Sequence, residues 1–369
     1  MENSINSISK EIYDIAGVEF NISSPKQLGE ILFEKLELPY GKKNKSGGYT
    51  TDVNVLNKLR YLNPIIPLIL EYRSLTKLKS TYIDGIVDLI KEDGKIHTIY
   101  TQTLTRTGRL SSTEPNLQNI PMRNEYGRLI RKAFIPEEDS IILSSDYSQI
   151  ELRIFAHLSN AKELIDAFNN NMDIHTKTAM DIFKVSEDKV TKNMRRQAKA
   201  VNFGILYGIS SFGLSEELEI NPKDAKKFIE TYFLTYPSIK DYMSSVIDKA
   251  HKDGYVKTIM NRKRTIDEIN NKNKIIQNMG ERMALNTPVQ GSSADIIKKA
   301  MVEIASELKN KKLKSKMLLQ VHDELIFNVY KDEIEVVKKI VKDIMENTYK
   351  LSVPLKVDIE TGNNWYEAK

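Results

Sequence analysis

The sequence predicts an α+β fold in which a small sheet receives strands from both sides of a long helical insertion. Three observations predict it. Apolar residues recur at helical spacing near the start of the chain, short apolar runs occur near residue 140 and again after residue 316, and the chain between those runs has a mostly helical pattern. Such a sheet would bring residues that are distant in sequence close together.

The N-terminal part of the chain is predicted to be helical. Apolar residues recur at helical spacing over residues 24–36 and 53–82, and a basic, glycine-containing loop separates these segments. Lys42, Lys43 and Lys45 lie in this loop. Two interpretations stay open, a solvated connector or a loop that contacts a nucleic-acid backbone through these lysines.

The pattern becomes β-like over residues 95–104, and an apolar strand over residues 140–145 ends at Asp146. The chain is then mostly helical to about residue 308. A basic stretch, residues 309–316, is interpreted as a solvated loop.

A tight hairpin is predicted near the C-terminal end. Apolar runs over residues 317–321 and 325–329 flank the sequence His322-Asp323-Glu324, which is typical of a turn between two strands. A helix over residues 333–348 and a strand over residues 355–359 complete the prediction.

Composition excludes several classes of protein. The 369 residues are enough for two or three subdomains, and 40% apolar with 28% charged residues is ordinary globular composition. The absence of cysteine excludes thiolate catalysis, disulfides and Cys-ligated metals. The 55 Lys plus Arg exceed the 50 Asp plus Glu by only five, which permits a polyanionic partner without requiring one. No apolar window is long enough to span a membrane, so a membrane is not expected as a partner.

Acidic residues at the predicted strand ends suggest a metal site. Asp146 follows a strand, and Asp323 and Glu324 are placed in the hairpin turn. Each alone is better explained as a turn or strand-end acid, since Asp is common in turns. Together they fit Mg²⁺, which takes one or two carboxylates beside water and phosphate. The five histidines lack metal-ligand spacing, so zinc is not expected.

Four residues spaced by four, Arg195, Lys199, Phe203 and Tyr207, would form one stripe on a helix. Two cations followed by two aromatic rings match a nucleoside triphosphate laid along the helix. The alternative is an ordinary helix with exposed charges and a core aromatic pair.

Three further interpretations concern single residues. Gly204 and Gly208 favour a close backbone approach or a helix end near Gly208. Asp173, two residues before His175, is interpreted as a helix cap, and Trp365 as a packing residue.

Five stretches together resemble the family A DNA polymerases. Residues 146–153 (DYSQIELR) and 322–324 (HDE) are similar to the two palm motifs, and residues 195–208 (RRQAKAVNFGILYG) to the finger-helix motif. Two further signature stretches are residues 107–121 (TGRLSSTEPNLQNIP) and 287–295 (TPVQGSSAD). They occur in the order of the family, and the resemblance extends from about residue 20 to the end.

The resemblance implies a right-hand architecture with an antiparallel palm sheet. It places the thumb at residues 1–92, the palm at residues 93–160 and 286–369, and the fingers at residues 161–285. The start of the thumb and the exonuclease domains of the family have no counterpart in these residues, so no proofreading is expected, and a separate chain is a conceivable source of the missing N-terminal domains.

The resemblance also implies a two-metal site. Asp146 and Asp323 would bind two Mg²⁺ ions, with Mn²⁺ as a substitute, and the backbone carbonyl of Tyr147 would assist. Glu324 would be an accessory acid, and Lys199 would donate a proton toward pyrophosphate.

For substrates, the resemblance implies contacts to the incoming nucleotide and to DNA. The predicted nucleotide-binding residues are Gln149, Glu151, His175, Arg195, Lys199, Phe203 and Tyr207. Among them, Glu151 would be the steric gate against a ribose 2′-hydroxyl, and Phe203 implies discrimination against dideoxynucleotides. The predicted DNA-binding residues are Arg109, Asn116, Gln118, Arg282, Asn286, Gln290 and His322.

The function that the resemblance implies is template-directed addition of dNTPs to a primer 3′-hydroxyl with release of pyrophosphate, in DNA replication or repair. The implied partners are primer–template DNA and dNTPs, and the implied state is a monomer. The expected location is the cytoplasm, in association with the nucleoid. The alternative is the replication machinery of an organelle or a virus.

Two rival classes share part of the pattern. A single-subunit RNA polymerase has similar palm chemistry, but Glu151 and the Phe203–Tyr207 end of the finger helix favour deoxynucleotides. A non-catalytic DNA-binding remnant would be expected to have lost Asp146 or Asp323, and both are present.

Overall fold

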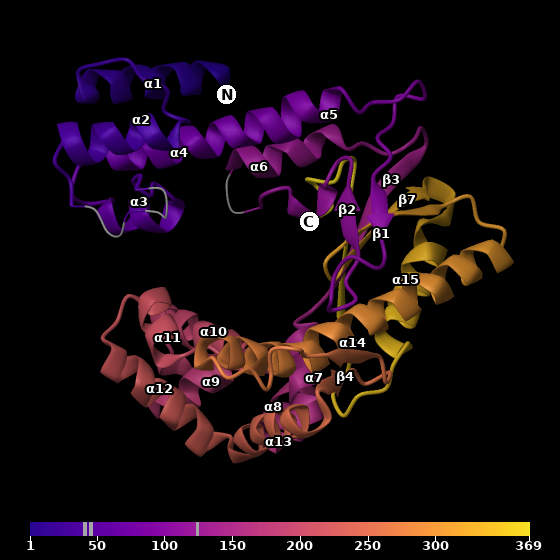
Figure 1. The fold of residues 1–369 in the computed structure, drawn as a ribbon. Helices are drawn as coiled ribbons and strands as arrows, with labels where there is room; N and C mark the ends of the chain where they lie inside the picture. Colours follow the sequence, from indigo (N-terminus) through magenta and orange to yellow (C-terminus); the bar gives the residue numbers. More distant parts are fainter. Residues whose placement is uncertain (40–42, 44–46, 123–124) are drawn as a thin grey trace. The chain divides into compact units, whose positions relative to one another are not determined.

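The computed structural model describes residues 1–39, 43, 47–122 and 125–369 (Figure 1). The chain divides into two compact units. Unit 1 comprises Met1–Ile99 and Thr113–Phe134, and unit 2 comprises Tyr100–Ser112 and Ile135–Lys369. Strands β1 (Ile99–Thr101) and β2 (Ser111–Thr113) pair in a small two-stranded sheet.

Unit 1 is helical. Its α-helices are α1 (Glu2–Ala16), α2 (Pro25–Glu30), α3 (Val53–Leu59), α4 (Ile65–Leu78), α5 (Gly85–Val87) and α6 (Glu125–Ile130). Helix α2 continues as a π-helical turn over Ile31–Lys35, and α4 as another over Lys79–Asp84.

The helices of unit 1 begin and end where the sequence supplies caps. The Ser24 side chain accepts a hydrogen bond from Gln27 N at the start of α2, and the Asp52 side chain accepts from the first turn of α3. Gly17, with φ of 66°, ends α1. The apolar faces of α1, α2 and α4 bury a core that includes Ile12, Leu28 and Ile66.

Unit 2 is built around a four-stranded antiparallel sheet in the order β6-β7-β3-β8. Its strands are β3 (Ser140–Tyr147), β6 (Lys316–Val321), β7 (Glu324–Tyr330) and β8 (Val357–Gly362). In the central pair, Asp146 lies opposite Glu324 of β7, and on its other side it lies opposite Asp358 of β8. Segments before and after the long helical region therefore contribute strands to one sheet, as predicted.

Between β3 and β6 the chain is mostly helical. The helices are α7 (Ile150–Ser159), α8 (Lys162–Asn169), α9 (Ile174–Phe183), α10 (Lys192–Leu206), α11 (Ser211–Leu218), α12 (Pro222–Thr235), α13 (Pro237–Asp253) and α14 (Lys274–Asn310). Helix α15 (Ile334–Asn347) follows β7 and packs against the sheet, where the Tyr147 hydroxyl donates to Met345 O at 2.7 Å. None of the helices within the described residues is long and apolar enough to cross a membrane.

The structure corrects three local predictions. Only Ile99–Thr101 of the β-like segment 95–104 forms a strand. A hairpin of β4 (Tyr255–Lys257) and β5 (Lys263–Thr265) interrupts the predicted helical region, because these three-residue strands are too short and polar to show alternation. The turn between β6 and β7 contains only His322 and Asp323, so Glu324 belongs to the strand and not to the turn.

Candidate active site

The three predicted acids meet at one end of the unit 2 sheet. Asp146 lies near the end of β3, and the Tyr147 N–H donates to the Asp323 backbone carbonyl at 3.1 Å. This bond attaches the hairpin turn to the end of β3. The sheet therefore fixes the backbone of both aspartates, whereas a free loop would let their side chains drift.

Glu324 is the buried member of the group. Its side chain is only 2% exposed and accepts hydrogen bonds from Ser144 Oγ at 2.7 Å, Trp365 Nε1 at 3.4 Å and Lys369 Nζ at 2.9 Å. These donors come from β3 and the C-terminal segment. The packing role predicted for Trp365 is confirmed, since it is 1% exposed.

The carboxyl of Asp146 lies in an environment that disfavours its charged form. Burial raises the pKa of its carboxyl to about 6; Lys369, at 3.9 Å, opposes the shift, while Glu324 and Asp323 add to it. Asp358, directly across from it on β8, adds a further like charge. This strand end therefore has more negative charge than Lys369 balances.

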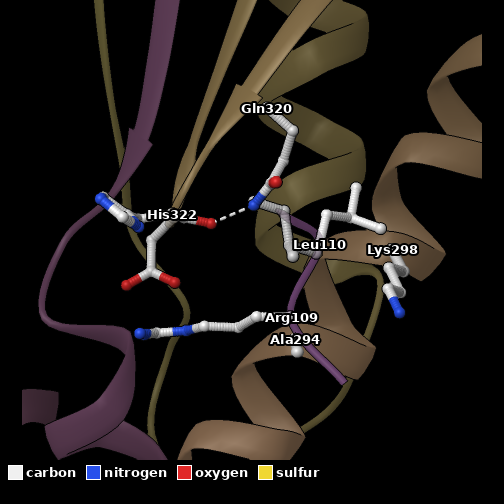
Figure 2. A pocket seen from close by; sticks show the side chains of 8 residues that line it. Arg109, Leu110, Ala294, Lys298, Gln320 and His322 are labelled. Carbon is white, nitrogen blue, oxygen red and sulfur yellow. Dashed lines mark hydrogen bonds between the residues drawn. The ribbon is translucent and has the colours of Figure 1, made fainter. Parts of the chain in front are cut away.

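A shallow pocket lies beside the hairpin turn. It is lined by Arg109, Leu110, Ala294, Ile297, Lys298, Gln320, His322 and Asp323. Figure 2 shows Gln320 and His322 on the hairpin, joined by the hydrogen bond from Gln320 Nε2 to His322 O, and Arg109 entering from another segment. Asp323 itself accepts a hydrogen bond from Ser293 Oγ of α14 at 2.9 Å.

Glu151, in the first turn of α7, bonds two other predicted substrate-binding residues, Arg109 and Tyr207. Its side chain accepts from Arg109 Nη2 at 2.7 Å and from the Tyr207 hydroxyl. The carboxylate is 8% exposed, and burial raises its pKa, while Tyr207 and Arg109 oppose that shift. Two partners therefore hold this carboxylate in one position. Gln149, another predicted nucleotide-binding residue, occupies the N-cap position of α7 in a left-handed conformation with φ of 55°, and its side chain makes no capping hydrogen bond.

The predicted stripe lies on α10 as expected from its spacing. Arg195 and Lys199 are exposed, and the rings of Phe203 and Tyr207 stack at 6.4 Å between centroids. Tyr207 is 38% exposed, so these rings are not a fully buried pair. Among the described residues Lys199 forms no ion pair, which leaves its ammonium available to an anionic ligand.

Arg195 has a local partner. Its guanidinium donates to both carboxylate oxygens of Asp173, at 3.0 and 2.8 Å. Asp173 also caps α9, because its side chain accepts from Thr176 N at 2.7 Å, which confirms the predicted cap. Burial alone would raise the pKa of Asp173, but the hydrogen bonds from Arg195 and Thr176 outweigh it and lower the pKa to about 2.

His175 lies on α9 next to this stripe. Its ring is 5.7 Å from that of Phe203, and the side chain is 3% exposed. Burial lowers its pKa to about 4; Asp173 opposes the shift, and the charges of Arg195 and Lys199 add to it. The structure thus brings His175 to the two cations that share its predicted role.

Both glycines behave as the sequence predicts. Helix α10 ends at Leu206, and Gly208 follows it with φ of 68°. A Cβ added at Gly204 would lie 2.7 Å from Ile209 Cγ2, so the chain approaches itself closely there.

The remaining predicted DNA contacts fall into two groups. Arg282, Asn286 and Gln290 share one face of α14, and Asn286 Oδ1 is buried with no hydrogen-bond partner among the described residues. Asn116 and Gln118 belong to unit 1, where the Asn116 side chain caps a 3₁₀ turn by accepting from Gln118 N at 3.0 Å.

The basic loop of unit 1 is partly outside the described residues. Lys42 and Lys45 fall there, so their predicted contacts with a nucleic-acid backbone stay a prediction. Lys43 Nζ lies 4.6 Å from the centroid of the Tyr49 ring.

Several site residues were missed at the level of sequence. Asp173 was interpreted as a cap, but not as the partner of Arg195. Ser293 lies in the signature stretch 287–295, but its contact with Asp323 was not predicted, and Lys369, which contacts Glu324, carried no signal. Asn202, buried between α9 and α10, was also missed, although its position on the inward face of the α10 stripe could have drawn attention to it.

The carboxylates fit divalent cations. The described residues contain no cluster of three His, Asp or Glu side chains in ligating position, but Mg²⁺ commonly takes only one or two carboxylates and completes its shell with water and phosphate. The excess negative charge around Asp146 is the environment that such an ion would neutralise.

Comparison with known proteins identifies the family. Residues 1–367 match the profile of DNA polymerase family A. The chain belongs to that family. DNA polymerase I of Lactococcus lactis subsp. cremoris is 56% identical over 369 residues, which cover 100% of this chain and 42% of that protein. DNA polymerase I of Bacillus subtilis is 55% identical over 362 residues, 98% of this chain and 41% of that protein.

A solved structure has the same fold. The POL domain of Pol1 from M. smegmatis, in complex with DNA primer-template and dNTP, superposes with a TM-score of 0.94 at 44% identity, covering 100% of this chain and 65% of that chain. The family and the α+β polymerase fold predicted from the sequence are both confirmed. The chain spans about two fifths of the length of the curated relatives, so it corresponds to their polymerase domain.

Proposed function

We propose that this chain catalyses template-directed addition of deoxynucleotides to the 3′-hydroxyl of a DNA primer, with release of pyrophosphate. The acid pair of unit 2 carries the proposal, because Asp146 and the Asp323 turn are joined by the Tyr147–Asp323 backbone hydrogen bond at a sheet end with excess negative charge. Its family relatives are named DNA polymerase I, which supports the same reaction.

The acids would hold two Mg²⁺ ions, with Mn²⁺ as a substitute, and the Tyr147 carbonyl would assist. Such ions, when bound, stabilise charge on the attacking and leaving oxygens. Asp146 and Asp323 supply the ligands. Glu324 contributes less directly, since its oxygens are already occupied by Ser144, Trp365 and Lys369.

The α10 stripe would bind the incoming nucleotide. Arg195, Lys199 and His175 contact the triphosphate. Gln149, which follows Asp146 closely in the sequence, lies nearby. The primer 3′-hydroxyl loses its proton to solvent and its oxygen bonds to the α-phosphorus; the bond between that phosphorus and the oxygen bridging to the β-phosphate breaks, and Lys199 donates a proton to the departing pyrophosphate. Arg195 bonds Asp173 through Nε and Nη2, which leaves Nη1 to donate to phosphate oxygens.

Glu151 would select deoxynucleotides. Its buried carboxylate, held by Arg109 and Tyr207, occupies a fixed volume where a 2′-hydroxyl would have to fit. Phe203 and Tyr207 would flank the nascent base pair, and Phe203 would disfavour dideoxynucleotides.

Duplex DNA is the proposed second partner. Arg109, Arg282, Asn286, Gln290 and His322 of unit 2, with Asn116 and Gln118 of unit 1, are the proposed contacts. In the right-hand polymerase architecture, we assign the thumb to residues 1–92, the fingers to residues 161–285, and the palm to residues 93–160 and 286–369.

The test is extension of a labelled primer–template with Mg²⁺ and one nucleotide at a time. We expect incorporation only of the dNTP complementary to the template base, and none of the matching rNTP. Salt-sensitive binding of the duplex without any extension would instead support a non-catalytic DNA-binding protein, and preference for rNTPs would support an RNA polymerase.

A further inference from the structure

A buried amide lies behind His175. Asn202, on the inward face of α10, is 1% exposed, and its Nδ2 lies 3.1 Å from His175 Nδ1. The same amide exchanges hydrogen bonds with the Thr178 hydroxyl, at 3.1 and 3.2 Å. Thr178 is itself fully buried on α9, one turn after His175. The three side chains form one network between the two helices.

This network determines which ring nitrogen carries a proton. An amide N–H that donates to Nδ1 requires a lone pair there, so a neutral ring must carry its proton on Nε2. Nε2 forms no hydrogen bond within the described residues, and it is not among their fully covered, unpartnered polar atoms. Its edge of the ring therefore reaches the surface although His175 is 3% exposed.

The surroundings keep the ring neutral at physiological pH. His175 is the second residue of α9, so it lies at the positive end of the helix dipole. Its charged neighbours are Asp173, Arg195 and Lys199; with burial, the two cations lower its pKa to about 4. A triphosphate bound at the stripe would thus meet two permanent cations and one neutral imidazole.

We propose that Asn202 is a positioning residue that locks His175 in the Nε2–H tautomer, so that a neutral imidazole donates a hydrogen bond to the triphosphate of the incoming nucleotide. The inference rests on the proposed function, because it assumes that the triphosphate lies against Arg195, Lys199 and His175. Thr178 supports the lock by holding the other side of the amide.

The tautomer matters because phosphate oxygens only accept hydrogen bonds. The Nε2–H tautomer offers them a donor, whereas the Nδ1–H tautomer would direct a lone pair at them. Losing one such bond and leaving a polar atom unpaired weakens binding by roughly tenfold.

The first experiment reads the tautomer directly in the whole, ligand-free protein. Selective ¹⁵N-histidine labelling gives the ring signals, and His175→Gln assigns those of His175. At pH 7 we expect a protonated Nε2 and an unprotonated Nδ1. In Asn202→Asp, which keeps the size but replaces the donor with an acceptor, we expect the proton on Nδ1. A protonated Nδ1 in the wild type would overturn the inference whatever the enzymatic activity.

The second experiment separates positioning from general stability. We expect Asn202→Leu to raise the KM for dNTP about tenfold while kcat changes less than about twofold. The matched control is Asn328→Leu, which removes another buried amide, 2% exposed and bonded to Ser140 Oγ and Glu137 N. Equal KM values in the two variants would overturn the positioning role.

A pH profile adds a readout that a structural role would not change. In Asn202→Asp the new carboxylate stabilises the imidazolium, so the KM for dNTP should be lower at pH 6 than at pH 8 relative to the wild-type profile. An unchanged profile would count against the inference. Because Asn202→Asp is isosteric, it decides the matter even where Asn202→Leu does not fold. Failure of the wild type to extend any primer would defeat the proposed function, whereas the tautomer measurement would still stand.

Discussion

Two regions of unit 2 hold opposite charges by opposite means. The carboxylate end, Asp146, Asp323 and Glu324, is built on paired strands, and its acids outnumber the lysine that faces them. The cation stripe, Arg195 and Lys199 on α10, is exposed, and Arg195 has a carboxylate partner of its own in Asp173.

The pKa values express the difference. Burial and like charges raise the pKa of Asp146 to about 6, against the opposing effect of Lys369, whereas the hydrogen bonds of Asp173 overcome its burial and lower its pKa to about 2. The carboxylate end is thus fixed in place and electrostatically unfavourable until a cation binds. In the cation stripe, Arg195 is paired with Asp173 at rest, whereas Lys199 forms no ion pair among the described residues and is available to an anion.

The largest expected effect comes from neutralising the carboxylate end. Asp146→Asn and Asp323→Asn should each lower the rate of nucleotide addition by about 10³-fold or more, since bound metal supplies several kcal/mol to the transition state and each 1.36 kcal/mol is tenfold. Single-turnover primer extension measures this rate.

DNA affinity serves as the control for these variants. Binding of primer–template in the absence of metal should change little, because neutralising an acid removes no phosphate contact. Extension by Asp146→Asn at the wild-type rate would contradict the metal assignment.

The cation stripe should separate binding from chemistry. Lys199→Met is expected to lower kcat by about 10²-fold or more through loss of the proton donor, with Lys199→Arg retaining charge but recovering little of the rate. Arg195→Met should act mainly on the KM for dNTP, because its role is to bind phosphate. Pre-steady-state incorporation at varied dNTP resolves the two effects; equal changes in both constants for both variants would remove the distinction.

The sequence predicted which residues form the α10 stripe, but it did not predict the side chains that contact them. A spacing of four residues determines one face of a helix, so Arg195, Lys199, Phe203 and Tyr207 were placed correctly. The partner of Arg195 lies 22 residues away on another helix, and only the packing of α9 on α10 brings them together.

The carboxylate end shows the same limit. Apolar runs around Asp146 and Asp323 predicted strands that meet, and the register places Asp146 opposite Glu324. The opposing Asp358 and the bridging Lys369 could not be predicted, since β8 and the C-terminal segment join the site only through tertiary packing. Local periodicity predicts elements, but the electrostatics of a site depend on contacts between them.

Glu151 links the two regions, and its loss should have an intermediate effect. Glu151→Ala opens space beside the sugar, so discrimination between dNTP and rNTP should fall by about 10- to 200-fold, the range for a small steric difference in a pocket. Competition between dATP and ATP for one template position measures it. Because Arg109 and Tyr207 both bond this carboxylate, Glu151→Gln should retain most of the discrimination; a loss as large as that of Glu151→Ala would point to charge and not volume.

The smallest effect concerns stability and has opposite signs in the two regions. Because the native pKa of Asp146 lies above its ordinary value of 3.8, the folded state binds more protons between pH 4 and 6, and Asp146 costs stability as pH rises through that window. Asp146→Asn should therefore raise the free energy of unfolding at pH 8 by about 1 kcal/mol, after allowing for its partial exposure, and change it little at pH 4.

Asp173→Asn is the matched opposite of that variant. Its native pKa is lowered, so its contribution is present above pH 4 and is lost as pH falls toward 2. Asparagine keeps the helix cap but not the ion pair with Arg195, so the substitution should lower stability at pH 8 by about 1 kcal/mol or less. Urea unfolding of both variants without metal measures the two signs. Since added Mg²⁺ would compensate Asp146 and leave Asp173 untouched, it should reduce the stability gain of Asp146→Asn only; equal responses to Mg²⁺ would mean that the two regions do not differ in the way their charges imply.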